Sequence, residues 1–338
     1  MGYFERVHQF TPTRFWVNNP TLAQARLAKA AGAINCTTNP TYVSKMLKAE
    51  DMRPAVMDEI RKQKAECSDV SEIAARVQRT AVKALMAEFA PMHAAAPKRQ
   101  GFVSLQGDPT KEHDPANIIA EAEADRALGG NVIAKIPVTE AGLEAIEYLA
   151  KRDMPIIATE IMSVSQCLAA CEAYARSGGT NAFFVTCIAG IFDDCLKNQY
   201  KEGRFEIHPD ILFQAGTVLM RRQYRLMRER QLPGILLGGG ARGLHHFTEF
   251  VGGACDITIN WKGTADALLE ADAPVISRMD TPTPEYVLDA LMKVPTFAAA
   301  YAADGLARQD YADFPPVALF RSQFEAGWAA LIKEIENA

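Results

Sequence analysis

The sequence predicts an α/β protein in which eight short parallel strands alternate with helices and close into a (β/α)8 TIM barrel. Apolar runs rich in β-branched residues recur along the chain, each too short for a helix and bounded by glycine, proline or asparagine. Helical segments separate these runs, and that alternation is typical of a parallel sheet. Eight repeats within roughly 250 residues match the usual length of a closed barrel.

Prolines punctuate the first two repeats. Arg14–Asn18 is a short apolar strand, and Pro20 follows it at the start of an alanine-rich helix that ends near Ala31. Proline is well tolerated in the first turn of a helix. The second strand, Ala33–Thr37, leads to Pro40, which stops the strand and opens the next helix.

A long helical region precedes the third strand. Residues 41–88 are rich in Ala, Glu, Lys and Met and exceed the length of one barrel helix, so part of this region is an expected insertion. A Pro/Ala/His stretch, Pro91–Pro97, then leads into the strand Gly101–Gln106, which Gly107 and Pro109 bring to an end.

The remaining repeats keep the same alternation. The five further strands are Asn131–Thr139, Pro155–Ile161, Asn181–Thr186, Gly234–Leu237 and Asp256–Asn260. Helices are expected at Pro115–Leu128, Glu140–Arg152, Ser163–Arg176, near Arg221–Arg230 and at Leu244–Val251, with a long mixed segment between Ile191 and Arg221.

No internal linker divides the chain of 338 residues. We therefore expect a barrel over residues 1–270 and a C-terminal helical extension over residues 271–338. The last helix, around Phe324–Ile335, is expected to pack over the outside or over one mouth of the barrel. Barrels with extra helices often bury them between subunits, so a homo-oligomer is possible.

Charge and patterning exclude several classes of partner. The net charge of −5 offers no broad basic surface for nucleic acid. No window approaches the run of about 18 apolar residues that a membrane helix needs, and the N-terminus lacks an apolar segment of signal-peptide length. These features predict a cytoplasmic protein without a membrane partner.

The cysteines and histidines predict no metal site. Seven scattered cysteines contain no C-x-x-C pair. Only His245 and His246 adjoin, and neighbours in a helix point about 100° apart, so we do not expect them to share a metal. A dinucleotide-binding glycine motif and a Walker loop are both absent, and we expect no cofactor.

The fourth strand carries Lys135 in its middle. Burying an unpaired ammonium costs several kcal/mol, so this lysine has two interpretations. It is either a charge that reaches solvent or an ion-pair partner near the strand end, or a desolvated amine with a lowered pKa. A neutral amine can attack a ketone and form a Schiff base.

Catalytic groups in such barrels come from the carboxyl ends of the strands. The residues at these ends are mostly amides and hydroxyls around one amine: Asn18, Thr37, Asn39, Gln106, Lys135, Thr159, Thr186, the loop Gly238–Gly240 with Arg242, and Asn260. This set suits a polyhydroxylated carbonyl substrate that carries an anionic group.

Three motifs in this set are more specific: Thr37-Thr38-Asn39-Pro40, the strand Ile133–Thr139 followed by Gly142-Leu143, and Thr159 with Ser163 and Gln166. By these motifs, which lie in the same order and spacing over roughly residues 14–266, the sequence resembles the transaldolase family, including its smaller relative fructose-6-phosphate aldolase.

The resemblance implies a class I aldol mechanism without metal or organic cofactor. Lys135 would form a Schiff base with a ketose or ketose phosphate, and a dihydroxyacetone-type unit would pass to an aldehyde acceptor, as in carbohydrate metabolism and the pentose phosphate pathway. The implied catalytic residues are Lys135, Gln106, Thr159 and Asn18. The implied substrate-binding residues are Thr37, Asn39, Ser163, Gly239, Gly240 and Arg242.

Two departures concern proton transfer. Gln106 stands where transaldolases have a glutamate and the fructose-6-phosphate aldolases a glutamine, and a glutamine orients water without accepting its proton. Strand alternation directs Glu160 away from Thr159, so we expect it on the opposite face, as a structural carboxylate or as a substitute base. Asn18 replaces the family aspartate that handles the hydroxyl at the breaking bond, and an amide can bind this hydroxyl but cannot accept its proton.

A third departure concerns phosphate. Ile191 stands where the family has a phosphate arginine. The second anion site, Gly239-Gly240-Ala241-Arg242, matches, and a glycine loop leading into a helix offers N–H groups to an anion. Arg242 is therefore either an anion ligand or a surface ion-pair partner.

Three functions remain open. The first is a transaldolase-like transferase. The second is a lyase like fructose-6-phosphate aldolase, acting on a non-phosphorylated or atypical ketose, which Gln106 favours. The third, from another class, is a weakly catalytic sugar-binding or regulatory homologue, or a barrel whose lysine is only structural, and Asn18 and Ile191 favour this class.

Overall fold

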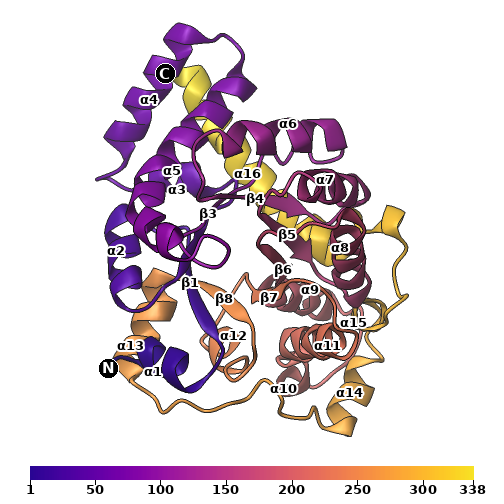
Figure 1. Ribbon diagram of the computed structural model, residues 1–338. Helices are drawn as coiled ribbons and strands as arrows, with labels where there is room; N and C mark the ends of the chain where they lie inside the picture. Colours follow the sequence, from indigo (N-terminus) through magenta and orange to yellow (C-terminus); the bar gives the residue numbers. More distant parts are fainter.

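Eight parallel strands close into a barrel in the order of the sequence (Figure 1). The computed structural model describes all residues 1–338. The strands are β1 (Arg14–Asn18), β2 (Asn35–Thr37), β3 (Val103–Leu105), β4 (Val132–Pro137), β5 (Ile156–Ile161), β6 (Phe183–Cys187), β7 (Ile235–Gly238) and β8 (Asp256–Asn260). Every predicted strand is present, and β8 pairs with β1 to complete the predicted (β/α)8 TIM barrel.

Helices lie between successive strands and surround the barrel (Figure 1). Those up to β6 are α1 (Tyr3–Phe10), α2 (Leu22–Ala30), α3 (Tyr42–Met46), α4 (Arg53–Glu66), α5 (Val70–Ala95), α6 (Pro115–Arg126), α7 (Glu140–Ala150) and α8 (Val164–Ser177). The later elements are α9 (Ala189–Lys201), α10 (Pro209–Leu212), α11 (Ala215–Glu229), α12 (His245–Thr248), η1 (Trp261–Ala265), α13 (Asp266–Ala271), α14 (Glu285–Leu291), α15 (Pro295–Tyr301), η2 (Arg308–Asp310) and α16 (Pro315–Asn337).

Several helices differ from the sequence-based prediction: α1 was not predicted, and α11 begins at Ala215, before the expected start near Arg221. Helix α5 continues through Pro91 to Ala95, beyond the helical region that was expected to end near residue 88. The proline removes only one N–H, and its ring lies on the exposed side of the helix, so packing of the rest of α5 outweighs its cost. Helix α12 covers only His245–Thr248, about half the predicted segment Leu244–Val251.

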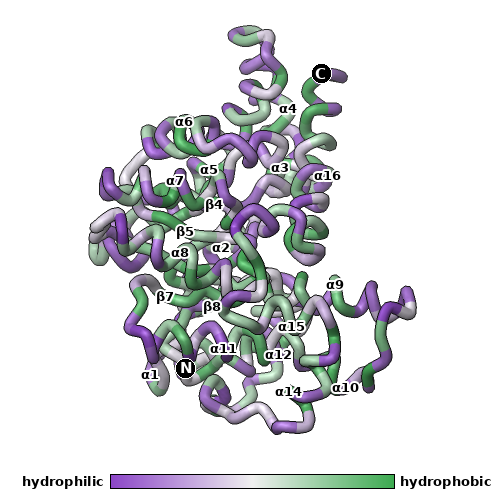
Figure 2. Tube along the Cα trace, turned by 90° about the vertical axis from the view of Figure 1, so that its right-hand side faces the viewer, coloured by the Kyte–Doolittle hydropathy of each residue, from purple (hydrophilic) through white to green (hydrophobic).

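The helical region that was expected to contain an insertion lies partly outside the barrel. Helix α4 packs against α5 and the far end of α16, and it stands away from the strands at the top of Figure 1. The strands are mostly green in Figure 2, whereas purple, hydrophilic stretches concentrate on the surrounding helices. No helix is both long enough and apolar enough to cross a bilayer.

Large apolar side chains fill the lower half of the barrel. Trp16, Phe102, Ile133, Ile157, Phe184 and Leu237 form one buried cluster there. Asp256 is fully buried beneath them; its carboxylate accepts hydrogen bonds from both terminal nitrogens of Arg99 at 2.6 Å and from Trp16 Nε1 at 2.8 Å. This packed floor leaves only the carboxyl ends of the strands open for a site.

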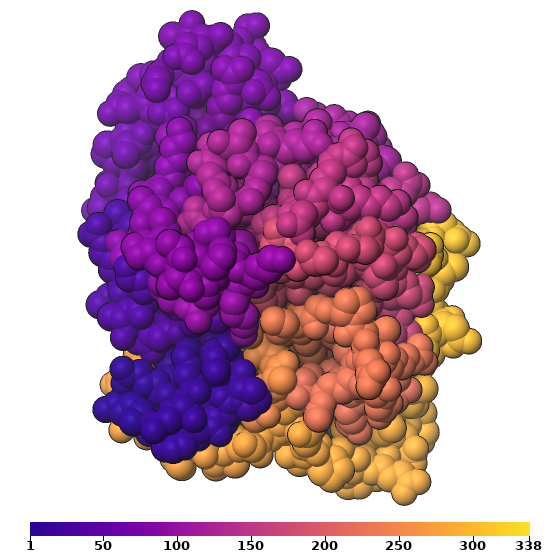
Figure 3. All heavy atoms as spheres, in the orientation of Figure 1, coloured from indigo at the N-terminus to yellow at the C-terminus, as the bar shows by residue number.

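Helix α16 crosses the open end of the barrel. It passes behind the strands in Figure 1, and in Figure 2 it lies with α3 and α9 on one side of the molecule. It packs against α3, α5, α9 and β5. The opposite face, seen in Figure 3, consists of indigo, magenta and orange segments, and the yellow of α16 does not appear across it. The last helix therefore lies over one mouth of the barrel.

Candidate active site

One cavity of about 470 Å³ lies at the carboxyl ends of the strands, beneath α16. Most of the predicted site residues line it: Asn18, Thr37, Asn39, Lys135, Gly239, Gly240 and Arg242. Helix α16 adds Phe320, Gln323, Phe324 and Gly327, and the α3 region adds Ser44, Lys45 and Lys48. Helix α16 thus covers this mouth of the barrel, which is open in a simple (β/α)8 barrel.

Lys135 projects from β4 into this cavity and is 8% exposed. Its Nζ makes no hydrogen bond or ion pair, and it lies 5.5 Å from the ring centroid of Phe324 on α16. Burial lowers the pKa of the Lys135 amine to about 8; Glu160 works in the opposite direction, and Lys45 lowers the pKa further. At that pKa roughly a tenth of the amine is neutral at pH 7, far more than for a free lysine.

A chain of hydrogen bonds links β8, β2 and β1 across one wall of the cavity. The hydroxyls of Thr37 and Thr258 lie 2.7 Å apart, and Thr37 Oγ1 donates to Asn18 Oδ1 at 2.9 Å. Asn18 Nδ2 in turn donates to Asn260 Oδ1 at 2.9 Å. These bonds fix which end of each amide faces the cavity, and Asn18 presents no group that can accept a proton.

The Thr-Thr-Asn-Pro turn after β2 is tied to β3. Ser104 Oγ accepts a hydrogen bond from Thr38 N at 3.0 Å, and Thr38 Oγ1 donates to Ser104 O. Asn39 Oδ1 accepts from both the backbone and the hydroxyl of Thr41. A Cβ on Gly327 would lie 3.0 Å from Thr41 Cα, so glycine allows α16 to approach this turn closely.

Gln106 and Thr159 lie near the cavity without lining it. A smaller cavity of about 20 Å³ next to Gln106 lies between β3, β4 and α6, and it is large enough for a single water molecule. Thr159 Oγ1 and Gln106 Oε1 are buried and have no protein partner. Thr159 lies two residues beyond Ile157, which lines the main cavity, so both face the barrel interior.

Glu160 lies beside this pair, contrary to the prediction that it would point to the opposite face. Gln106 Nε2 donates to Glu160 Oε1 at 2.8 Å. The pairing of β5 with β6 shifts register between Ala158 and Ile161, and Glu160 has a φ of 62°. Simple alternation fails here because a bulge inserts one residue and turns the backbone into the left-handed region.

Burial affects the ionisation of two carboxylates at this point. It raises the pKa of Glu160 to about 7, although Gln106 and then Lys135 oppose the rise. It raises the pKa of Glu112 to about 9, and the negative charge of Glu160 adds to that effect. Arg321 Nη1 lies 3.9 Å from Glu112 Oε1. At neutral pH, Glu112 is therefore protonated, and Glu160 is close to its midpoint.

Ser163 does not reach the cavity. It is fully buried, and its hydroxyl caps α8 by accepting a hydrogen bond from Gln166 N at 3.1 Å. The Gln166 amide donates to Val138 O and to Glu160 O, and its Oε1 accepts from Met162 N. These contacts hold the bulge after β5 in place, so Ser163 and Gln166 support Glu160 in this fold.

The loop after β7 brings Arg242 to the cavity. Arg242 Nε donates to Asp194 Oδ2 at 2.5 Å, so the side chain both forms an ion pair and lines the cavity. Gly240 has a φ of 67°, and a Cβ there would lie 2.6 Å from Ile188 Cγ2 and 3.2 Å from Ile191 Cγ1. Ile191 is 1% exposed and packs beneath this loop. Because isoleucine is uncharged, this position provides no positive charge to bind an anion. Helix α12 follows at His245, one residue after the expected start at Leu244.

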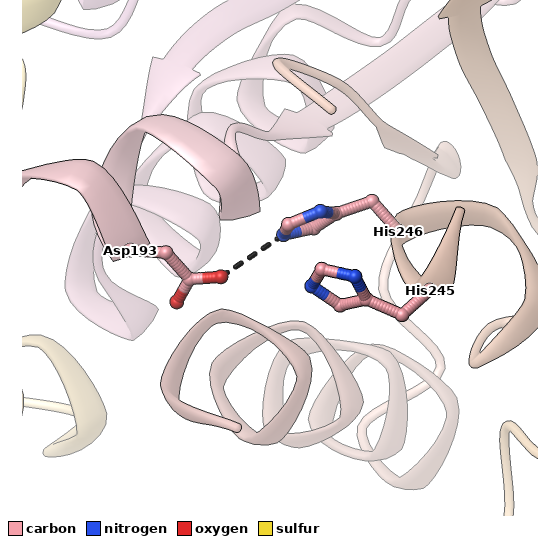
Figure 4. Close-up of side chains that lie close together, drawn as sticks. All are labelled: Asp193, His245 and His246. Carbon is pink, nitrogen blue, oxygen red and sulfur yellow. Dashed lines mark hydrogen bonds and ion pairs between the residues drawn. The ribbon is translucent and has the colours of Figure 1, made fainter. Parts of the chain in front are cut away.

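Asp193, His245 and His246 form a cluster in which the three side chains lie close together (Figure 4). Their possible ligand atoms lie within 4.8 Å of one another. The two histidine side chains are therefore close together, although the sequence predicted that they would point in different directions. However, the Arg242 N–H donates to His246 Nδ1, so His246 Nε2 carries the hydrogen that it shares with Asp193 Oδ2 at 3.0 Å. Asp193 Oδ1 also accepts from Gly216 N. Metal ligation through Nε2 would set Nδ1–H against the Arg242 N–H, so the cluster fits a structural role better than a metal.

Sequence reasoning missed several residues around Lys135. Lys45 and Lys48 follow the Thr-Thr-Asn-Pro turn, and their spacing of three residues was a signal that they share one side of a helical turn. Phe324 could not be assigned to the site from the sequence. A local sequence pattern does not show which end of the barrel is covered by a helix that lies far from the strands in the sequence.

Comparison with known proteins gives consistent matches. Residues 16–309 match the family model described as Transaldolase/Fructose-6-phosphate aldolase. The chain is 27% identical over 183 residues to a transaldolase of Neisseria meningitidis serogroup A, covering 48% of this chain and 48% of that protein. It is 30% identical over 151 residues to a transaldolase of Arthrobacter sp., covering 44% of this chain and 40% of that protein.

A shorter match is 38% identical over 81 residues to a probable transaldolase of Pelotomaculum thermopropionicum, covering 24% of this chain and 34% of that protein. The chain spans about half the length of the curated relatives it matches.

Proposed function

The chain belongs to the transaldolase/fructose-6-phosphate aldolase family, and from that premise we propose that it performs Schiff-base aldol chemistry on a ketose, with Lys135 as the nucleophile. The observation that carries the proposal is the position of Lys135: buried, without an ion-pair partner, and directed into the main cavity. Burial that lowers its pKa to about 8 supplies neutral amine at working pH.

The proposed reaction begins when Lys135 Nζ attacks the ketose carbonyl and forms a carbinolamine. Loss of water gives an iminium ion. Cleavage of the bond between the α and β carbons then sends its electron pair through the α carbon to the iminium nitrogen, the hydroxyl on the β carbon gives up its proton to water, and an aldehyde leaves. The remaining enamine of a dihydroxyacetone unit attacks an acceptor aldehyde, whose oxygen gains a proton, and water releases the new ketose from the lysine.

Glu160 is the proposed proton carrier for the dehydration and hydration of the carbinolamine. Its Oε1 accepts from Gln106, its Oε2 is buried without a partner, and burial raises its pKa to about 7. A carboxyl group near its midpoint both gives and takes protons at neutral pH. Gln106 Oε1 and Thr159 Oγ1, which are buried without a protein partner, would orient a water molecule for this step.

A lyase is the second candidate function. Gln106 Oε1 and Thr159 Oγ1, buried without a protein partner, are suited to hold a water molecule that would protonate and hydrolyse the enamine and release dihydroxyacetone without an acceptor. Incubation with donor ketose in the presence and absence of an acceptor aldehyde separates the two activities: a transferase needs the acceptor, and a lyase releases the three-carbon product without it.

Borohydride trapping tests the proposal. The protein is reduced with sodium borohydride in the presence of dihydroxyacetone, fructose or fructose 6-phosphate, and intact mass and peptide mapping locate any adduct. We expect an adduct on Lys135 that is absent from Lys135→Met and present in Lys62→Met, a control in which an exposed lysine of α4 is lost.

The size of the adduct identifies the step that is reached. A three-carbon adduct from a six-carbon donor supports both imine formation and cleavage. An adduct that retains the whole sugar supports imine formation alone, the outcome expected if Asn18 slows cleavage. Absence of an adduct on Lys135 with every donor would overturn the proposal and favour a sugar-binding homologue.

A further inference from the structure

The proposed reaction places a positive charge in a cavity that has no acidic side chain in its lining. Lys45, Lys48 and Arg242 line this cavity together with Lys135, and its other residues are uncharged. The Lys135 amine is neutral when it attacks, but its nitrogen becomes a cation once the carbinolamine loses water. A cation in a site of low dielectric is costly unless a group that attracts it lies close by.

Glu160 offsets only part of this cost. Its negative charge raises the pKa of Lys135, whereas the positive charge of Lys45 lowers it. The Glu160 carboxylate does not line the cavity, and one of its oxygens accepts a hydrogen bond from Gln106. Burial also raises the pKa of Glu160 to about 7, so the group is charged only part of the time at neutral pH. A second stabilising group on the cavity side of the nitrogen would lower the cost further.

Phe324 lies at that position. The Nζ of Lys135 lies over the ring of Phe324, 5.5 Å from its centroid. The face of an aromatic ring carries partial negative charge and attracts a cation within about 6 Å, most strongly where water is excluded. Unlike a carboxylate, the ring takes no proton from the nitrogen that it stabilises.

The surroundings of Phe324 hold the ring in place. The side chain is 1% exposed, and its ring packs against that of Phe320 with centroids 4.2 Å apart. Trp328, one turn further along α16, is buried in the main core. Because the ring is already in position before the charge forms, it stabilises that charge without reorganisation.

We propose that Phe324 is a catalytic residue of this site, and that the face of its ring stabilises the iminium ion on Lys135 through a cation–π interaction. The inference rests on the proposed function, because it concerns an intermediate of that reaction. The neutral amine gains nothing from the charge distribution of the ring, so the interaction favours the intermediate over the reactant state. It also keeps the imine protonated, the form that accepts the electron pair when the carbon–carbon bond breaks.

Fluorination of the ring tests the inference, because fluorine withdraws charge from the ring face and changes the size of the side chain little. Phe324 is replaced site-specifically by phenylalanines that carry successively more fluorine atoms. The measurement is the dihydroxyacetone concentration that gives half-maximal borohydride-trapped adduct on Lys135. It is made at about pH 9, where most of the free amine is neutral and changes in its own protonation contribute little.

We expect the half-maximal concentration to rise with each added fluorine, by about tenfold over the whole series. A role of Phe324 in packing alone would not produce this graded rise, since the shape of the ring is nearly constant.

The same replacements at Phe320 are the matched control. Phe320 lines the same cavity one turn earlier on α16, but Lys135 Nζ lies over the ring of Phe324. A constant half-maximal concentration throughout the Phe324 series, or an equal rise in the Phe320 series, would overturn the inference. Absence of an adduct from the parent protein would instead contradict the proposed function, so the two failures are distinguishable.

Discussion

Asn18 ends β1 with an amide whose two ends are both engaged. Its Oδ1 accepts from Thr37 and its Nδ2 donates to Asn260. The amide can hold a substrate hydroxyl in place of one of these partners, but it cannot remove the proton that must leave when the carbon–carbon bond breaks. We therefore expect Asn18 to slow cleavage of the carbon–carbon bond. It does not affect formation of the imine on Lys135.

Asn18→Asp should therefore raise the rate of cleavage, by roughly 100-fold if proton removal limits that step. The Thr37 bond to Oδ1 is retained, and the exposed Asn260 amide can rotate to donate to the new carboxylate oxygen. Single-turnover release of aldehyde from fructose 6-phosphate measures the rate. Asn18→Ala, which binds no hydroxyl, should be slower than the parent; an unchanged rate in Asn18→Asp would mean that another group accepts the proton.

The bulge in β5 is the element that turns Glu160 toward Lys135. Because the negative charge of Glu160 raises the pKa of Lys135, removing it should lower that pKa. In the parent, kcat/KM should rise with pH as Lys135 loses its proton and level off above about pH 8. Glu160→Gln should move this rise to lower pH and also reduce the plateau, because a proton carrier is lost.

A pH profile of kcat/KM for both proteins tests this prediction. Glu112→Gln is the control: burial raises the pKa of Glu112 to about 9, so the group is already neutral over most of the range and its replacement should leave the rise in place. A rise displaced to higher pH in Glu160→Gln would show that Glu160 does not act on the charge of Lys135.

The regular alternation of strands and helices could be predicted from the sequence, whereas local irregularities within it could not. All eight strands follow from apolar runs with proline and glycine boundaries, and Lys135 follows from its place in one of them. The face of β5 on which Glu160 lies could not be predicted. A single inserted residue at the bulge reverses the alternation of side chains between the two faces of the strand. Ser163 was predicted from its neighbours in a motif, and the structure uses it as a helix cap.

Helix α16 packs against the rest of the molecule through two separate hydrophobic clusters. Trp328, Leu331 and Ile335 belong to the main core, while Phe320 and Phe324 belong to the second. Burial of a large apolar side chain contributes about 1.5–3 kcal/mol. Loss of only two such contacts is therefore a large fraction of the roughly 5–15 kcal/mol that stabilises a typical domain.

The division into residues 1–270 and 271–338 remains a prediction, and thermal unfolding tests it. We expect the full-length protein to unfold in one cooperative transition. A chain truncated after residue 270 should lose that transition, because both clusters would be exposed. A truncated chain that melts cooperatively near the parent Tm would instead identify the barrel as an independent unit.

The ring over Lys135 also links the reactivity of the lysine to the docking of a single helix. Phe324 belongs to α16, and its ring centroid lies 5.5 Å from Lys135 Nζ. Burial is the first cause of the lowered pKa of this amine, and a lysine in water keeps its proton at neutral pH. Local detachment of α16 would therefore leave every strand residue of the site in place and still remove the reactive amine, so the site is chemically competent only while this helix is docked.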